Sequence, residues 1–360
     1  MKRMFFAASN GRYGFVNHFE KIFSPDGLDT IYIIKGGPGT GKSTFIKKLG
    51  EYAEGKGCRA DYYLCSSDPD SFDGVIFDYG GKKISVLDGT SPHVTDAKYP
   101  AACEKILNFT ECLSEERLKQ RKMEIADESA KMKECYGRAY LFFDIAGRAL
   151  DLRLGACECA YKRDKAEAFI KRFFRGFRGG IKDPINAELC AVCHKGRVRL
   201  KTHAHEAEMV YFISEYYGLE QFLLADIYEY AKAHRIPAAV SHSAVFSDRI
   251  DSIFFYGEGI LVALSCDNDE WGRSGALKKI NTARFADAGI IKAEREFIRG
   301  AVKLEEAAVE RGIGQMKLAK KHHDALEEIY GSAADFERIN DMLLRCKREI
   351  FGREDENWDL

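Results

Sequence analysis

A glycine-rich loop between an apolar run and a helix-forming segment constrains the fold of this chain more than any other feature. Residues 36–44 read GGPGTGKST; they follow the apolar residues 31–34 and precede the helix-forming residues 45–52. This spacing of glycine, lysine and hydroxyl side chains is that of a phosphate-binding loop, and both flanking elements agree with it. The sequence therefore predicts a strand, a loop and a helix that begin an α/β fold, with a nucleoside triphosphate as ligand.

The residue types in this loop suit a polyanion. Gly37, Gly39 and Gly41 allow backbone conformations that turn successive N–H groups toward phosphates, and the helix N-terminus adds partial positive charge. Lys42 is expected to contact the β- and γ-phosphates of ATP or another nucleoside triphosphate, and Ser43 to ligate Mg²⁺. The other residues expected to contact the nucleotide are Pro38, Thr40 and Thr44. The alternative is a glycine-rich turn that matches the pattern by chance.

An acidic side chain at the end of a neighbouring strand usually helps to hold magnesium. Residues 83–87 are predicted to form a strand, and Asp88 follows it directly. Asp88 is therefore the second candidate metal ligand; the alternative is an aspartate that only builds a turn with Gly89. Because Gly89 stands where many motor ATPases have a glutamate, a fast power-stroke ATPase is disfavoured.

Two further segments carry candidate site residues. The loop at residues 66–74 follows the predicted strand at residues 59–65 and contains Asp68, Asp70 and Asp73. Asp68, with Lys42 and Asp88, is a candidate catalytic residue because a carboxylate can orient an attacking hydroxyl or water, and Asp70 is a weaker candidate. These aspartates equally suit turns. Asp73 has a counterpart in the second half of the chain, which favours a structural role.

His93 and a basic helix are the remaining candidates. His93 follows Asp88 closely and is expected to sense the γ-phosphate, to act as an acid or base, or to cap a turn. Residues 162–178 predict an amphipathic helix with phenylalanines every four residues and a basic face. Three interpretations of this face are open. It is exposed to solvent, it closes as a lid on phosphates through Arg172 and Arg175, or it contacts nucleic acid or anionic lipid.

The order of predicted elements indicates a duplicated fold. Strand and helix alternate over the first 90 residues, which predicts a parallel sheet flanked by helices, and residues 96–178 predict a helical excursion with a hairpin of helices and a third helix. Glycine and proline near residues 179–184 mark a boundary. We therefore expect one domain at residues 1–180 and a second at residues 185–360, each with its own helical excursion.

The second copy lacks the glycine loop. Laying Ile31 on Met209, an offset of 178 residues, aligns Asp73 with Asp251 and puts Glu220 at the position of Lys42. This reverses the charge directed at the phosphates, and tyrosines replace the glycines, so that nothing of the loop is expected to survive. The strand, helix, strand, strand order is retained at residues 209–213, 219–231, 238–241 and 259–264. We expect a structural or partner-binding copy that binds no triphosphate.

Composition narrows the class of protein. The chain has 46% hydrophobic and 31% charged residues and a net charge of −1, so a nucleic acid is an unlikely main partner. No segment has the roughly 18 consecutive apolar residues that a membrane helix requires, and 11 scattered cysteines suit a reducing compartment, so a cytoplasmic location is expected. Cys190, Cys193 and His194 match a haem-attachment motif and, with His203 and His205, a weak zinc pattern; a core strand is the preferred interpretation.

Together these motifs resemble a family of largely uncharacterised bacterial proteins with two tandem phosphate-loop domains, described as ATPases or nucleotide-kinase-like proteins. The resemblance lies in the glycine loop and in residues 65–74 and 88–93, and it implies an ATP- and Mg²⁺-dependent NTPase or kinase-like phosphotransferase. The phosphoryl acceptor, water or a small molecule, stays open. A nucleotide-gated binding module that acts on a protein partner with little turnover is the alternative.

Overall fold

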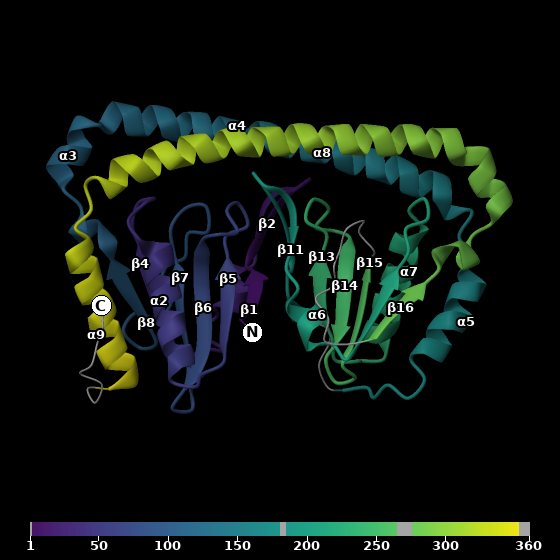
Figure 1. Ribbon diagram of the computed structural model, residues 1–360, viewed down its shortest axis with the longest axis horizontal. Helices are drawn as coiled ribbons and strands as arrows, with labels where there is room; N and C mark the ends of the chain where they lie inside the picture. Colours follow the sequence, from purple (N-terminus) through teal and green to yellow (C-terminus); the bar gives the residue numbers. More distant parts are fainter. Residues whose placement is uncertain (1, 181–184, 265–275, 353–360) are drawn as a thin grey trace. The chain divides into compact units, whose positions relative to one another are not determined.

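The computed structural model describes residues 2–180, 185–264 and 276–352 and divides the chain into two compact units (Figure 1). Unit 1 comprises Met1–Ala8, Asn17–Gly137 and Gln315–Leu360; unit 2 comprises Ser9–Val16 and Arg138–Gly314. Each unit contains one six-stranded sheet with helices packed against it. The chain therefore has a duplicated α/β architecture, as the sequence predicts.

The sheet of unit 1 is mixed. Its strand order is β1-β5-β6-β7-β4-β8, in which β6 is antiparallel to both neighbours and the other strands run parallel to one another. The strands are β1 (Arg3–Phe6), β4 (Thr30–Lys35), β5 (Ala60–Leu64), β6 (Phe72–Tyr79), β7 (Lys82–Asp88) and β8 (Glu104–Asn108). The expectation of an all-parallel sheet is wrong because β6 and β7 form a hairpin through Gly80 and Gly81, both with positive φ.

The sheet of unit 2 has the same topology. Its strand order is β16-β12-β15-β14-β13-β9, with β14 antiparallel to both neighbours. The strands are β9 (Ile185–Asn186), β12 (Met209–Ile213), β13 (Ala239–His242), β14 (Ile250–Phe255), β15 (Ile260–Leu264) and β16 (Ala276–Ile280). Both β14 and β16 lie where the sequence indicates no strand. Agreement in order and in strand direction, strand by strand, supports a duplication.

The helical excursions differ in two respects from the expected ones. A single long helix, α4 (Lys122–Glu158), stands where a hairpin of helices is expected, and α8 (Ala288–Gly331) is its counterpart in the second half. Residues 104–108 of the first excursion form β8 instead of helix. The other helices are α1 (Phe19–Ile22), α2 (Lys42–Gly55), α3 (Glu115–Gln120), α5 (Arg163–Phe173), α6 (Thr202–Glu206), α7 (Leu219–Ala233) and α9 (Phe336–Phe351), with short 3₁₀ helices η1 (Phe109–Cys112) and η2 (Thr282–Phe285).

The two halves of the chain exchange their last helices. Helix α5 packs on α7 in unit 2, and α9 packs on α2 in unit 1. An equivalent backbone hydrogen bond occurs in each unit. In unit 1, Ser114 N–H donates to Ala333 O at 2.8 Å, and in unit 2, Asp287 N–H donates to Ala160 O at 2.7 Å. The two donors are 173 residues apart in the sequence, and so are the two acceptors. The predicted ranges 1–180 and 185–360 thus each hold one complete sheet, but each compact unit draws on both halves of the chain. Residues 181–184, at the expected boundary, lie outside the described residues.

The cores follow from amphipathic patterning. Residues 31–34 of β4 are all buried, as central parallel strands require. The apolar face of α2, with Phe45, Ile46 and Leu49, joins Tyr32 and Ile34 in one cluster. Helix α9 adds Ile339, Leu343 and Cys346 to the same cluster. The short paired strands β2 (Ala8–Gly11) with β3 (Gly14–Asn17) and β10 (Cys190–Cys193) with β11 (Gly196–Arg199) complete the described strands. Within the described residues, no helix combines the length and the apolar character needed to cross a bilayer.

Candidate functional site

The glycine loop, residues 36–44, joins β4 to α2 at the edge of the sheet where the parallel strands of unit 1 end. Gly39 and Gly41 have φ values of 68° and 82°, in the left-handed region that favours glycine, and Gly41 is the N-cap of α2. The Thr40 hydroxyl donates to Gly37 O at 2.9 Å. The loop thus has the conformation for which its glycines are needed, at the N-terminus of a 14-residue helix.

Lys42 is the first residue of α2, and its side chain is buried within the loop. Its Nζ donates to Gly37 O at 2.6 Å and to Gly36 O at 3.3 Å. Nζ also lies 3.6 Å from Asp88 Oδ2. A buried ammonium is therefore held by loop carbonyls and one carboxylate, at the helix end that favours anions.

Asp88 ends β7, which pairs in parallel with β4 so that Asp88 lies opposite Ile34. Its Oδ1 accepts bonds from the backbone N–H of Thr90 at 2.9 Å and from the Thr90 hydroxyl at 2.6 Å. This fixes the carboxylate with Oδ2 on the side of Lys42. The position that the sequence predicts for Asp88, on the strand beside the loop, is the one observed.

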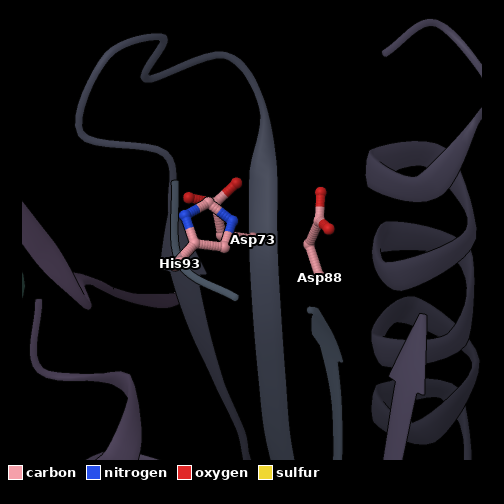
Figure 2. A group of neighbouring side chains, drawn as sticks. All are labelled: Asp73, Asp88 and His93. Atoms are coloured by element: carbon pink, nitrogen blue, oxygen red, sulfur yellow. The ribbon is translucent and has the colours of Figure 1, made fainter. Parts of the chain in front are cut away.

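Asp73 and His93 join Asp88 in a compact cluster (Figure 2). One possible ligand atom from each of the three side chains lies within 4.8 Å of the others. Asp73, on β6, is 7% exposed, and His93 is 5% exposed and stacks on Phe19 with ring centroids 4.4 Å apart. The sequence favours a structural role for Asp73, and the structure shows its carboxyl group close to the Asp88 carboxyl group and the His93 ring. The buried residues of β6 are the signal in the sequence for this position, and the turn-forming aspartates before them obscure it.

Electrostatics in the cluster depend on burial. Loss of hydration and the nearby Asp88 carboxylate raise the pKa of Asp73 well above its usual range, while Cys65 and Lys42 oppose this shift. Burial lowers the pKa of His93, and the charge of Lys42 lowers it further against the opposing effect of Asp88. Without a cation, a protonated Asp73 and a neutral His93 are therefore favoured. A bound cation reverses the preference at Asp73, because it stabilises the carboxylate.

The donor atoms of this cluster fit a divalent cation. The carboxylates of Asp73 and Asp88 are hard oxygen ligands suited to Mg²⁺, whereas the imidazole of His93 suits transition metals better. Ser43 Oγ accepts a bond from Phe72 N–H at 2.8 Å, which ties the start of α2 to the start of β6. Asp88 and Ser43, the ligands that the sequence predicts, are the residues that could hold Mg²⁺, and the Asp73 carboxyl group lies beside Asp88.

Asp68, the predicted orienting residue, pairs with a lysine of α8. Lys320 Nζ lies 3.2 Å from Asp68 Oδ2 and also pairs with Asp324. Asp70 is exposed, and its N–H donates to Asp68 Oδ1 at 3.3 Å. A catalytic role for Asp68 stays a prediction, and Asp73 is the carboxylate that lies with Asp88.

The end of α8 lies against the glycine loop within unit 1. A Cβ atom at Gly37 would approach the Tyr330 ring to 2.6 Å, and one at Gly39 would collide with the Glu327 backbone. Two glycines of the loop therefore permit close packing of a helix as well as a special backbone conformation. Sequence reasoning misses this contact because almost 290 residues separate its two sides.

The remaining residues that the sequence predicts for the site lie at the protein surface or outside unit 1. Thr44 is exposed on α2, and Pro38 is half-buried. Arg172 and Arg175 are exposed on or just after α5, whose packing partner is α7 in unit 2, so the structure does not bring them into the unit that holds the loop. The phenylalanines of this segment pack on the core of unit 2.

Residues 190–193 form the buried strand β10, which confirms the core-strand interpretation. His203 is buried and stacks on Phe254. Among the described residues, the two groups of three or more possible metal ligands are the Asp73 cluster and His323 with Asp324 and Glu327, and neither includes these cysteines.

The second loop, residues 214–218, corrects the expected register. Gly218 is the left-handed N-cap of α7, with φ 103°, as Gly41 is for α2, so Leu219 stands at the position of Lys42 and Glu220 one residue further on. Two backbone N–H groups of the second loop bind a carboxylate: Glu220 Oε2 accepts bonds from Tyr216 N–H at 2.8 Å and Gly218 N–H at 3.2 Å. The protein's own carboxylate occupies this place, and burial raises its pKa.

Comparison with known proteins adds no assignment: no protein-family model, no curated protein and no solved structure matches this chain.

Proposed function

We propose that unit 1 binds a nucleoside triphosphate with Mg²⁺ and transfers its terminal phosphoryl group to water or to a small acceptor, in the manner of a P-loop NTPase or a kinase. One observation carries the proposal. The buried ammonium of Lys42 lies between the glycine loop and Asp88, at the N-terminus of α2. The loop backbone, a buried cation and a carboxylate of the type that binds Mg²⁺ therefore lie at one end of the sheet, which supports the proposal.

Each group has a defined role in this proposal. The N–H groups of the loop and Lys42 bind and orient the β- and γ-phosphates, and Ser43 and Asp88 hold the metal. Mg²⁺ supplies charge neutralisation at the phosphates. Asp73, beside Asp88, is the carboxyl group placed to accept a proton from a nucleophile once a cation has favoured its ionised form. Positioning and electrostatic stabilisation account for most catalysis of this type.

A second candidate function has its own support. Tyr330 and Glu327 of α8 pack on Gly37 and Gly39, so that a triphosphate entering the loop meets this helix end. A nucleotide that binds one position of α8 better than another would shift its population, and the protein would then act as a nucleotide-gated switch on a partner, with slow turnover.

Binding is tested by thermal unfolding of the full chain with ATP and MgCl₂. A ligand at 100 times its Kd stabilises a protein by about 2.7 kcal/mol, so a clear rise in Tm is expected for the parent. Lys42→Ala should remove this rise, and Lys47→Ala, an exposed lysine on the same helix, should retain it. Equal stabilisation of the Lys42→Ala variant would refute the proposed site.

The two candidate functions are separated by phosphate release and by phosphoryl transfer to a panel of nucleosides. Steady turnover that is lost in Asp88→Asn supports the enzyme. Strong Mg-ATP stabilisation with no release and no transfer supports the switch.

A further inference from the structure

Unit 2 contains a cavity of about 770 Å³ beside its second loop. Residues 214–217 of the loop line it, and the charged residues among the others that line it are Arg153, Lys279, Arg299, Lys303 and Glu306. A volume of this size is typical of small-molecule sites, which run from about 300 to 1,000 Å³. All these residues belong to unit 2.

The cavity has an excess of positive charge. Of the residues that the structure describes, Lys279, Arg299 and Lys303 are exposed and form no ion pair. Arg153 is 7% exposed, and its charge is balanced by Glu305 at 3.2 Å and Glu215 at 3.7 Å. The three unpaired cations outnumber Glu306, the remaining acidic residue of the lining, and therefore favour an anionic ligand.

The remaining lining residues favour a flat ring. Tyr216 and Tyr217 have ring centroids 5.0 Å apart in an edge-to-face arrangement, and Ile298 and Val302 are the apolar lining residues. Aromatic side chains stack on planar ligands of any base type.

The ligand differs from the one expected in unit 1. Because the Glu220 carboxylate already accepts bonds from the loop N–H groups, a triphosphate cannot use them in the usual way. The anion must instead be held by side chains, and three exposed cations suit the charge of a single phosphate group.

We propose that this cavity binds a nucleoside monophosphate, with the base against the tyrosines and the phosphate between Arg299, Lys303 and Lys279. The proposal goes beyond the triphosphate site of unit 1 and does not depend on it.

The test is isothermal titration of the full chain with AMP. The parent and Lys42→Ala should bind AMP equally, and Arg299→Ala/Lys303→Ala should bind at least tenfold more weakly, since two charged contacts are lost. Lys292→Ala/Arg295→Ala is the matched control, because both residues are exposed on the same helix and lie outside the cavity lining. Thermal unfolding of all variants checks that these surface changes leave the fold intact.

Two further arms test the ring. Tyr216→Leu keeps apolar volume and should weaken AMP binding severalfold, and inorganic phosphate should bind more weakly than AMP. Absence of AMP binding, or equal affinity in the Arg299→Ala/Lys303→Ala variant and its control, overturns the site. Equal affinity for AMP and inorganic phosphate overturns the assignment of a nucleoside.

Discussion

Gly39→Ala tests whether α8 packs on the glycine loop as the structure shows. The substitution adds one methyl group at a residue with φ 68°, and that group would meet the Glu327 backbone. Gly57→Ala is a matched control, because Gly57 has φ 83° and no atom would lie within 4 Å of the added Cβ. Both variants place an alanine in the left-handed region, but only Gly39→Ala brings the new Cβ into collision with another backbone segment.

The expected magnitudes follow from these two effects. An L-residue in the left-handed region costs about 1–2 kcal/mol, which is the whole effect expected at Gly57. Overpacking against backbone, which cannot rotate away, adds about 1–3 kcal/mol at Gly39. We therefore expect a loss of unfolding free energy of about 2–5 kcal/mol for Gly39→Ala.

Urea unfolding followed by circular dichroism measures both losses, with the slope m checked for a change in the denatured state. If Gly39→Ala loses no more stability than Gly57→Ala, α8 does not lie on the loop. The switch proposal would then lose its structural support, while the proposal of a triphosphate site would be unaffected.

Three other predictions concern charge and stoichiometry. Because the pKa of Asp73 is raised in the folded protein, this side chain stays protonated there at pH values at which the unfolded chain has already lost the proton. The free energy of unfolding therefore falls as pH rises from about 4, the pKa in the unfolded chain, through the pKa in the folded protein. Asp73→Asn should flatten this fall in urea titrations at a series of pH values above about 4; an unchanged pH profile contradicts the burial argument. Glu220→Ala leaves the N–H groups of Tyr216 and Gly218 without their acceptor and should cost about 1–3 kcal/mol in calorimetry, whereas Glu220→Gln, which retains an acceptor, should cost less. Titration with Mg-ATP should give one site per chain, and two sites would refute our interpretation of the second loop.

Local patterns predicted the elements that are defined by their own residues. The apolar residues 31–34, the glycine loop and the helix after it form β4, the loop and α2, and Asp88 ends the strand beside them. The sequence predicts a loop over the first residues of β6, Phe72 to Gly74, because they follow a run of turn-forming aspartates. The edge strand β8 has one buried residue and no clear alternation of buried and exposed side chains. It is therefore recognised as a strand by its pairing with β4, which the sequence does not show.

The sequence alone determined where the backbone adopts left-handed conformations and where α2 begins, since glycine conformation and helix capping depend on neighbouring residues. It also determined that the fold is duplicated, because strand and helix patterns recur in order. Only the tertiary structure decided that Asp73 and His93 join Asp88, that α8 covers the loop, and that α5 and α9 exchange units. These three features depend on contacts between segments that are far apart in the sequence. Hydrophobic burial drives such contacts and is non-directional, so a local sequence pattern does not show which distant segment a buried face will contact.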